Sequence, residues 1–246
     1  MVVTISRGLL ENFIKRQFSV SKDGSFPQNS LFRDVFVDLV GMAINVQRAP
    51  VFVEGLSNDI CCPFVDISHN LYYLTQGSGE IIAIDQSGST ETIHNTNGEP
   101  SGAIFDDQGV IYIADQAHAA VLAIQETGEN QQELVVGVYE DKPLRGPHSI
   151  ACSSDGDVFF TDSGPFGETG LQNPQGSLFV ISNTPSGQML KPISLNNLAG
   201  PAGVALSSDG QFIYVCEMMT NRVLRYFQQP EGVYHASVFY QLSGGR

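Results

Sequence analysis

The sequence repeats one pattern at intervals that constrain the fold. Three clear copies are EPSGAIFDDQGVIYIAD, GPHSIACSSDGDVFFTD and GPAGVALSSDGQFIYVCE, which begin at Glu99, Gly146 and Gly200. Each copy has a proline, an aliphatic stretch, a polar turn that ends in glycine, and a β-branched or aromatic run. A fainter copy, CPFVDISHNLYYLTQ, begins at Cys62. The leading prolines recur at spacings of 37, 47 and 54 residues, which is close to the period of β-propeller blades.

Each copy predicts two antiparallel strands joined by a tight turn. The pairs Gln108-Gly109, Asp155-Gly156 and Asp209-Gly210 supply the positive φ that such a turn needs. A second apolar hairpin follows each copy: GEIIAID, AAVLAI, GSLFVIS and NRVLRYF. Each unit therefore predicts four strands, the content of one propeller blade. We expect inner strands near residues 102–107, 148–153 and 202–207.

Composition and charge exclude several classes of protein. The 246 residues carry a formal net charge of −14, so no basic surface is expected to neutralise nucleic-acid phosphates. No apolar run approaches the roughly 20 residues of a membrane-spanning helix. The four cysteines are too few for a disulfide scaffold, which favours reduced thiols and an intracellular, cytoplasmic location.

The first 30 residues differ from the rest and predict a separate helix and linker. ISRGLLENFIKRQF places apolar residues at helical spacing, with Arg7, Lys15 and Arg16 between them. One interpretation is a helix that packs on the domain or on a partner. The other is a basic amphipathic presequence for mitochondria. Residues 31–246 are then predicted to form the propeller domain.

Two of the repeats carry a family resemblance. NLAGPAGVALSSDGQFIYVCEMMTNRVLRYF and RGPHSIACSSDGDVFFTDS resemble the strictosidine synthase-like proteins. That group belongs to a clan of six-bladed propellers, of the NHL and SMP-30 type, that includes the gluconolactonases and the paraoxonases. The resemblance covers roughly residues 50 to 246 and implies an all-β, six-bladed propeller, of which about four blades are present here. The chain is then expected to be incomplete or to be closed by a partner.

The lactonase-type relatives imply a metal site that this sequence does not preserve. In those relatives a Glu of the first blade and Asn, Asn and Asp after the leading prolines hold one calcium or zinc ion. Here the positions after the prolines contain Phe64, Ser101, His148 and Ala202, and the position of the Glu falls near Cys61. Calcium prefers several oxygen ligands, so no tight calcium site is expected, and no cofactor is predicted. A softer site made by Cys61, Ser101 and His148 would suit zinc better.

The strictosidine synthase branch implies no catalytic residue here either. Its catalytic Glu belongs to a later blade than this chain reaches, so it is carried onto no residue of this sequence.

His148 is the predicted catalytic residue, because its register places it at the mouth of the central channel. A neutral imidazole there could take a proton, and its ordinary pKa predicts ligand affinity that changes near pH 6.5. The alternative is a histidine that hydrogen-bonds a loop. Ser101 and His118 are predicted ligand contacts at the same mouth, the first from the preceding blade and the second from a loop on the same face.

Two carboxylates complete the predicted ligand contacts. Glu168 lies in the long loop Ser163–Gly176, which is predicted to overhang the channel mouth. Asp59 lies close to the missing Glu ligand, as do Glu54 and Asn58. By contrast, Asp115 and Asp162 end the second strands of their blades, and this recurrence favours a structural task, the acceptance of hydrogen bonds from loop N–H groups.

Two functions remain open from the sequence. The first is a propeller that lacks the usual metal ligands, is catalytically degenerate and binds a small molecule or a protein. The alternative is a lactonase- or esterase-like hydrolase with its active site at the propeller mouth. The substituted metal positions favour the first function. The enzymatic activity of the family that the sequence resembles favours the second.

Overall fold

The computed structural model describes residue 56 and residues 58–125, 131–164, 169–184, 187–229 and 232–242. All of them belong to one compact unit, Val53–Arg246. The predicted N-terminal helix, the boundary at residue 30 and Glu54 lie outside the described residues. The described part contains strands, turns and loops but no helix, and therefore no candidate membrane-spanning helix.

The strands form four sheets of four strands each, which we call blades I to IV. Blade I contains β1 (Ile60–Val65), β2 (Leu71–Thr75), β3 (Glu80–Ile84) and β4 (Thr90–Asn95). Blade II contains β5 (Pro100–Phe105), β6 (Ile111–Asp115), β7 (Ala120–Ile124) and β8 (Gln132–Val136). The chain then forms a short hairpin of β9 (Val138–Tyr139) and β10 (Lys142–Pro143).

The other two blades repeat the same order. Blade III contains β11 (Pro147–Cys152), β12 (Val158–Asp162), β13 (Gly176–Thr184) and β14 (Gly187–Leu198). Blade IV contains β15 (Pro201–Leu206), β16 (Phe212–Glu217), β17 (Arg222–Gln228) and β18 (Tyr234–Gln241). In every blade the strands pair antiparallel in chain order, as predicted. The inner strands begin one or two residues before the positions expected.

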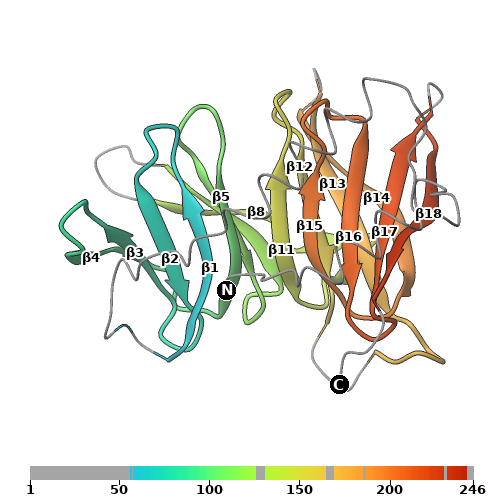
Figure 1. Ribbon diagram of the computed structural model, residues 1–246, viewed down its shortest axis with the longest axis horizontal. Coiled ribbons are helices and arrows are strands. Elements are labelled where there is room, and N and C mark those ends of the chain that lie inside the picture. The colour runs from blue at the N-terminus through green and yellow to red at the C-terminus, as the bar shows by residue number, and fades with distance from the viewer. Residues whose placement is uncertain are drawn as a thin grey trace, which may run out of the picture. The chain divides into compact units, whose positions relative to one another are not determined.

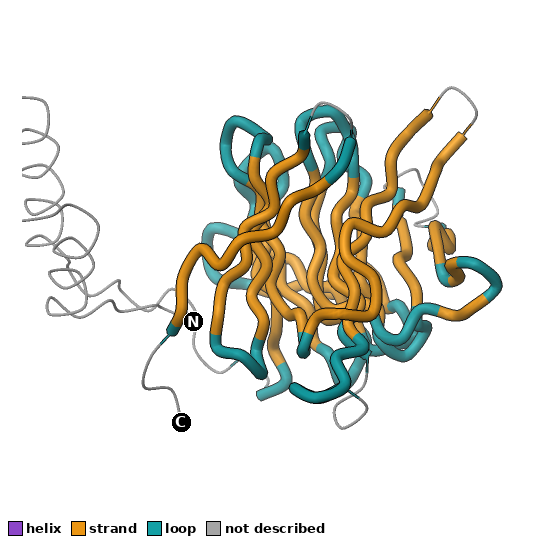
Figure 2. Tube along the Cα trace, turned by 90° about the vertical axis from the view of Figure 1, so that its right-hand side faces the viewer, coloured by secondary structure: helices purple, strands orange, loops and turns teal. Residues whose placement is uncertain are grey.

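The first strands of successive blades lie side by side. Strand β1 contacts β5, β5 contacts β11, and β11 contacts β15, and Figure 1 shows the four sheets following one another in chain order. Figure 2 shows the connections gathered at the two ends of the strands. The described residues therefore form consecutive blades of a β-propeller, which confirms the predicted fold class.

The predicted tight turns join the first and second strands. Gly109, Gly156 and Gly210 have φ values of 83°, 82° and 69°, a region that glycine adopts without strain. A side chain before each glycine closes the turn. Asp106 Oδ1 accepts hydrogen bonds from the N–H groups of Gln108 and Val110, at 2.9 and 2.8 Å. These residues act as turn formers, as their sequence pattern indicated.

The core lies between the blades. One apolar cluster joins blades I and II, a second joins II and III, and a third joins III and IV. In the second cluster the rings of Phe160 and Phe179 are fully or almost fully buried and stack at 5.4 Å. Because both faces of a blade are apolar, blades II and III each bury them against a neighbour on either side.

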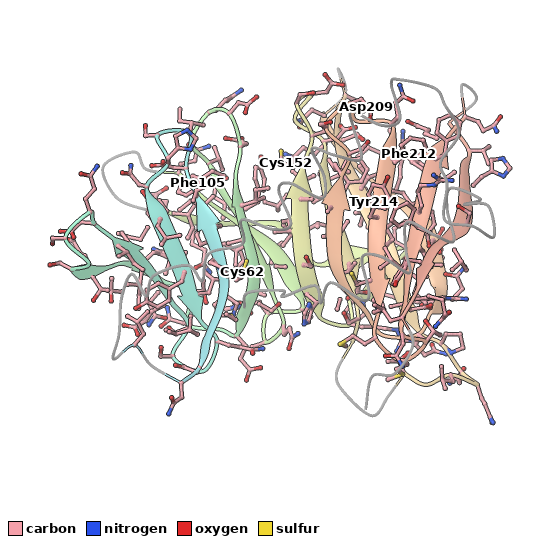
Figure 3. The ribbon with its side chains drawn as sticks, viewed as in Figure 1. Cys62, Phe105, Cys152, Asp209, Phe212 and Tyr214 are labelled. Atoms are coloured by element: carbon pink, nitrogen blue, oxygen red, sulfur yellow. The ribbon has the colours of Figure 1, made fainter. Side chains whose placement is uncertain are left out.

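Blade IV carries an aromatic surface on its side away from blade III. Phe227 and Phe239 are 38% and 48% exposed, and Figure 3 labels Phe212 and Tyr214 on the same blade. The guanidinium of Arg225 lies 5.0 Å from the ring centre of Phe212 and 5.8 Å from that of Phe239. The expectation that a partner covers or completes the propeller stays a prediction.

A buried polar group closes the second strand of each blade. In β2, β6, β12 and β16 it is Thr75, Asp115, Asp162 and Glu217 respectively, each at most 3% exposed. Asp162 Oδ1 accepts hydrogen bonds from the N–H groups of Arg145 and Gly146, at 2.9 and 2.7 Å. This confirms the structural task predicted for these carboxylates.

Glu217 ties together three parts of blade IV. Its Oε1 accepts a hydrogen bond of 2.7 Å from the N–H of Ala199, and its Oε2 accepts bonds of 2.6 Å from Thr220 Oγ1 and 2.5 Å from Arg222 Nε. Burial alone would raise the pKa of this carboxyl. The hydrogen bonds and the charge of Arg222 lower it by a larger amount, so the pKa of Glu217 lies below the ordinary value.

We predict that Glu217→Gln lowers the free energy of unfolding by about 2 kcal/mol at pH 7, because an amide nitrogen cannot accept the bonds from Thr220 and Arg222. The pKa of Glu217 is lower in the folded than in the unfolded chain. The stabilisation is therefore complete above the unfolded pKa, about 4.3, and is lost as the pH falls through the folded pKa. Urea denaturation of both proteins at several pH values measures this.

The matched control is Glu91→Gln, which removes an exposed carboxylate of β4. Its effect on stability is expected to be within about 0.5 kcal/mol at pH 7. A Glu217→Gln protein as stable as this control would contradict the role assigned to the buried carboxylate.

Candidate functional site

Two kinds of connection meet at one end of the blades, which we call the mouth face. One kind leads into a blade, and the other joins its second and third strands. A backbone hydrogen bond links the two in every blade: Gln76 to Asp59, Gln116 to Glu99, Ser163 to Gly146 and Met218 to Gly200. The turns between first and second strands lie at the opposite end, the turn face, where Figure 3 labels Asp209 and Cys152.

Strand register corrects the predicted metal-ligand positions in blade I. The prolines Pro100, Pro147 and Pro201 pair with Asp115, Asp162 and Glu217. In blade I the residue that pairs with the matching Thr75 is Ile60, and not Pro63.

An irregularity between Cys61 and Phe64 causes the offset, so Phe64 lies further along β1. Phe64 is 8% exposed and packs on Tyr72 and Phe105, with ring centres 5.5 Å away in both cases. The choice of Phe64 was therefore wrong. The equivalent positions, which we call the column, are Cys61, Ser101, His148 and Ala202.

The column side chains bind the backbone of the next blade. Cys61 Sγ donates to the carbonyl of Pro100 at 3.5 Å. Ser101 Oγ lies 3.1 Å from the carbonyl oxygen of Pro147 and 2.9 Å from that of His148. The ring of His148 in turn has a hydrogen bond to the backbone of Ala202. At three successive positions, groups that could ligate a metal instead join neighbouring inner strands.

The thiols of the column region are protonated at neutral pH in the metal-free chain. Burial, helped by Cys62 and the negative charge of Asp59, raises the pKa of Cys61 to about 11. Burial also raises the pKa of Cys62, whose sulfur accepts a hydrogen bond of 3.2 Å from the N–H of Ala103. Both sulfurs are hydrogen-bonded to the backbone of blade II, which assigns them a role in joining the blades. All four cysteines of the chain are free.

Of the predicted site residues, His148 has the setting most typical of a functional group. Its Nδ1 is buried without a hydrogen-bond partner in the described part of the chain. It lines a hollow at the mouth face together with residues that include Gln116, Ser163, Thr169 and Met218. Burial lowers the pKa of His148, and the hydrogen bond to Ala202 offsets part of this effect. The imidazole is therefore neutral at pH 7.

The hollow beside His148 is small. Its volume is about 10 Å³, which corresponds to about one water molecule, whereas ligand pockets are typically 300 to 1,000 Å³. Sequence analysis missed Gln116, Ser163 and Met218 here. Each directly follows the carboxylate that ends its second strand, and this repeated position was a signal that could have found them.

The other predicted ligand contacts lie near the mouth face but do not converge on His148. His118 Nδ1 lies 3.0 Å from Asp115 Oδ1, so it is held within its own loop. Asp59 is half-buried, and its carbonyl accepts the hydrogen bond from Gln76. Glu168 lies outside the described residues, although Thr169 of the same loop lines the hollow. Their roles as ligand contacts stay predictions.

The site thus belongs to a β-propeller whose column joins blades through hydrogen bonds. Residues 61–246 match the family described as the SMP-30/gluconolactonase/LRE-like region. The chain belongs to this family, as the sequence resemblance indicated.

Individual relatives agree with this assignment. The protein Strictosidine synthase-like 3 of Arabidopsis thaliana is 30% identical over 143 residues, which cover 54% of this chain and 35% of that protein. Lactonase drp35 of Staphylococcus haemolyticus is 25% identical over 189 residues, which cover 73% of this chain and 55% of that protein. The matches therefore span about a third to a half of the length of these relatives.

A solved structure confirms the fold. The gluconolactonase of Xanthomonas campestris superposes with a TM-score of 0.65 at 20% identity, over 76% of this chain and 64% of that one. At this identity the likeness concerns the fold alone. Within the described residues, no three His, Cys, Asp or Glu side chains lie close enough together to hold a metal ion.

We predict that calcium and zinc bind no more tightly than micromolar at the mouth, because the column offers no convergent oxygen ligands. Isothermal titration calorimetry with each ion measures this. Sub-micromolar calcium binding that His148→Ala or Ser101→Ala abolishes would contradict the prediction.

A second prediction follows from the lowered pKa of His148. The unfolded chain takes up this proton near pH 6.5 and the folded chain only at lower pH, so the free energy of unfolding falls as the pH drops below about 6.5. His148→Gln is expected to make stability less dependent on pH between 7.5 and 5.5, as measured by urea denaturation. His235→Gln, which changes an exposed histidine of β18, is the control and is expected to keep the wild-type dependence.

Proposed function

We propose that this protein is a catalytically degenerate member of its family that acts as a binding module. The single observation that carries the proposal is the column. Cys61 and Ser101 donate their hydrogen atoms to carbonyl groups of the next blade, and the side chain of Ala202 has no group that could bind a metal. A lactonase of this type needs a bound ion to polarise the carbonyl and to position a water.

The dimensions of the mouth support the same proposal. A hollow of about 10 Å³ beside His148 holds a water and not a lactone. The unpartnered Nδ1 of His148 is explained by such a water, because buried polar atoms are rarely left without a partner. The binding activity is then expected at other surfaces of the propeller, with a small molecule or a protein as the ligand.

The alternative function is a lactonase- or esterase-like hydrolase. One observation favours it: His148 is a buried, neutral imidazole at the mouth, with a free ring nitrogen among the described residues. Such a group could accept a proton from a water if the loop Ser163–Gly176 moved to admit a substrate. The similarity to proteins that are named lactonases agrees with this alternative but does not decide it.

We predict that the protein hydrolyses δ-gluconolactone and phenyl acetate no faster than buffer, with or without added calcium, because no metal polarises the carbonyl. A pH-stat for the lactone and absorbance for the ester measure the rates. The control is a His148→Ala protein, which should give the same background. Hydrolysis that calcium stimulates and His148→Ala removes would establish the hydrolase instead.

A further inference from the structure

The outer strand of blade IV, β18, is an open sheet edge whose composition differs from that of the other outer strands. Among the described strands, the fourth strand of every blade pairs only with the third. Figure 1 shows β18 beside β17 at the outside of blade IV. An open edge presents N–H and C=O groups that another strand can bind, so what protects each edge decides whether pairing occurs.

The other three outer strands carry residues that discourage pairing with another chain. Strand β4 contains Glu91, β8 contains Glu133, and β14 contains Lys191 followed by Pro192, which has no N–H to donate. By contrast, the sequence of β18 is YHASVFYQ, with no proline and no Asp, Glu, Lys or Arg. A second strand therefore meets the least resistance at β18.

The regular part of this edge is the segment Tyr234–Val238. It pairs residue by residue with β17. Beyond Val238 an irregularity in the pairing inserts Phe239, and a bulge of this kind interrupts regular pairing at an edge. The segment before the bulge is as long as an ordinary strand, which is enough to seat another strand.

The side chains of the segment alternate between the two faces of the sheet. Ala236 and Val238 pair with Tyr226 and Leu224, which are buried between blades III and IV, so they lie on the face toward blade III, as does Tyr234. Val238 is nevertheless 53% exposed, and Ala236 is exposed as well. An apolar row thus runs along the open edge, and two of its three side chains are exposed.

This row is complementary to itself. When two copies of the segment pair antiparallel about a two-fold axis at Ala236, Val238 of each copy lies opposite Tyr234 of the other, and the two alanines face each other. Aromatic and β-branched residues form a favourable cross-strand pair. His235 and Ser237 then meet on the opposite face of the sheet. Apolar side chains lie opposite apolar ones, and polar opposite polar, as a two-fold interface requires.

The local charge allows a second copy to approach at blade IV. The chain has a formal net charge of −14, so two copies repel each other wherever acidic surfaces meet. The described residues of blade IV are balanced, with Asp209 and Glu217 against Arg222 and Arg225. By contrast, residues 60–136, which form blades I and II, contain no lysine or arginine.

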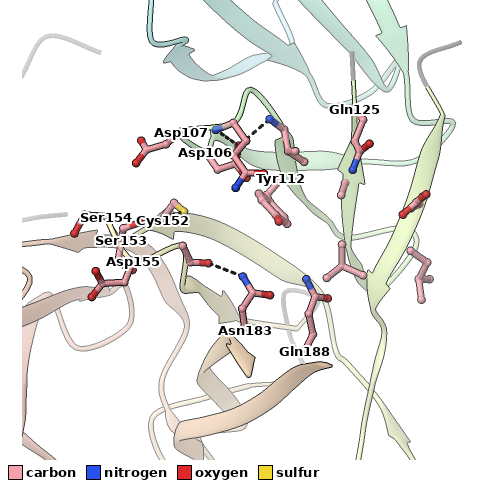
Figure 4. Close-up of a pocket in the computed structure, with 17 residues that line it drawn as sticks. Asp106, Asp107, Tyr112, Gln125, Cys152, Ser153, Ser154, Asp155, Asn183 and Gln188 are labelled. Carbon is pink, nitrogen blue, oxygen red and sulfur yellow. Dashed lines mark hydrogen bonds between the residues drawn. The ribbon is translucent and has the colours of Figure 1, made fainter. Parts of the chain in front are cut away.

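The acidic edges elsewhere argue against a basic partner at β18. Figure 4 shows Asp106 and Asp107 of blade II and Asp155 of blade III around a hollow of about 420 Å³ between these blades. A basic protein would be attracted to such surfaces rather than to blade IV. Because charges are screened beyond about 8 Å at physiological ionic strength, the charge near the contact matters more than the total. The neutral edge therefore suits a partner that is itself acidic, as a copy of this chain is.

We propose that the protein forms a two-fold symmetric dimer through β18, in which the segment Tyr234–Val238 of each copy adds antiparallel to the sheet of the other. The two four-stranded sheets of blade IV then form one continuous sheet. The contact uses the edge of the sheet and includes neither of its faces nor the mouth. The dimer therefore does not depend on whether the mouth is catalytic or degenerate.

The test measures the mass of the full chain by sedimentation equilibrium. Pairing along one short edge is a small interface, so a dissociation constant on the order of 10 µM is expected. Ala236→Lys places two like charges opposite each other and should weaken the dimer roughly tenfold or more, as should Ala236→Glu. An equimolar mixture of these two variants should dimerise again, because opposite charges then face each other.

Two controls locate the contact. Leu134→Lys adds the same charge to the exposed side of β8, and Phe227→Ser removes an exposed ring from the face of blade IV that points away from blade III. Both should dimerise as the wild type does. A wild-type chain that stays monomeric well above the expected constant would overturn the proposal. So would Ala236 variants that dimerise like the wild type, a mixture that stays monomeric, or a dimer that Phe227→Ser abolishes and Ala236→Lys does not.

Discussion

Packing between neighbouring blades is the interaction on which the rest of this structure depends. Each sheet is apolar on both faces, and the three main clusters of buried residues lie between blades. Because the faces are stacked, the inner strands β1, β5, β11 and β15 are brought side by side. Every functional surface is a consequence of this stacking, since the mouth face and the turn face are both built from residues of several blades.

Polar groups at the inner strands fix how the blades meet. Cys61 and Ser101 donate hydrogen bonds to carbonyl groups of the following blade. One blade later, Thr161 Oγ1 donates to the carbonyl of Ala202 at 2.8 Å, and Ser149 Oγ accepts a hydrogen bond of 3.1 Å from the N–H of Val204. These bonds occupy the region in which lactonase-type relatives are expected to hold a metal. In this protein the side chains of Cys61 and Ser101 hydrogen-bond the neighbouring blade.

The two ends of the blades differ in chemistry for a local reason. At the mouth face, buried carboxylates such as Asp162 and Glu217 accept hydrogen bonds from loop N–H groups, and the hollow there is small. At the turn face, the DDQG and SSDG turns use one side chain each to close and leave Asp107 and Asp155 exposed. A hollow of about 420 Å³ that these turns line, with Asp107 and Asp155 among its residues, therefore lies away from the position that the family resemblance indicated.

The sequence by itself determined the strands, the turns and the blade repeat, because alternation of apolar residues and Asp-Gly or Gln-Gly turns act over a few neighbouring residues. It also indicated the structural carboxylates Asp115 and Asp162 by their recurrence. The sequence placed Phe64 after the leading proline and Cys61 near the expected Glu ligand. The pairing of β1 with β2 then decided that Cys61 holds the position equivalent to Ser101, because the irregularity of β1 becomes visible only in that pairing. The hollow of about 420 Å³ between blades II and III likewise required the packed blades, since its two walls come from turns almost fifty residues apart that meet only when β5 lies beside β11.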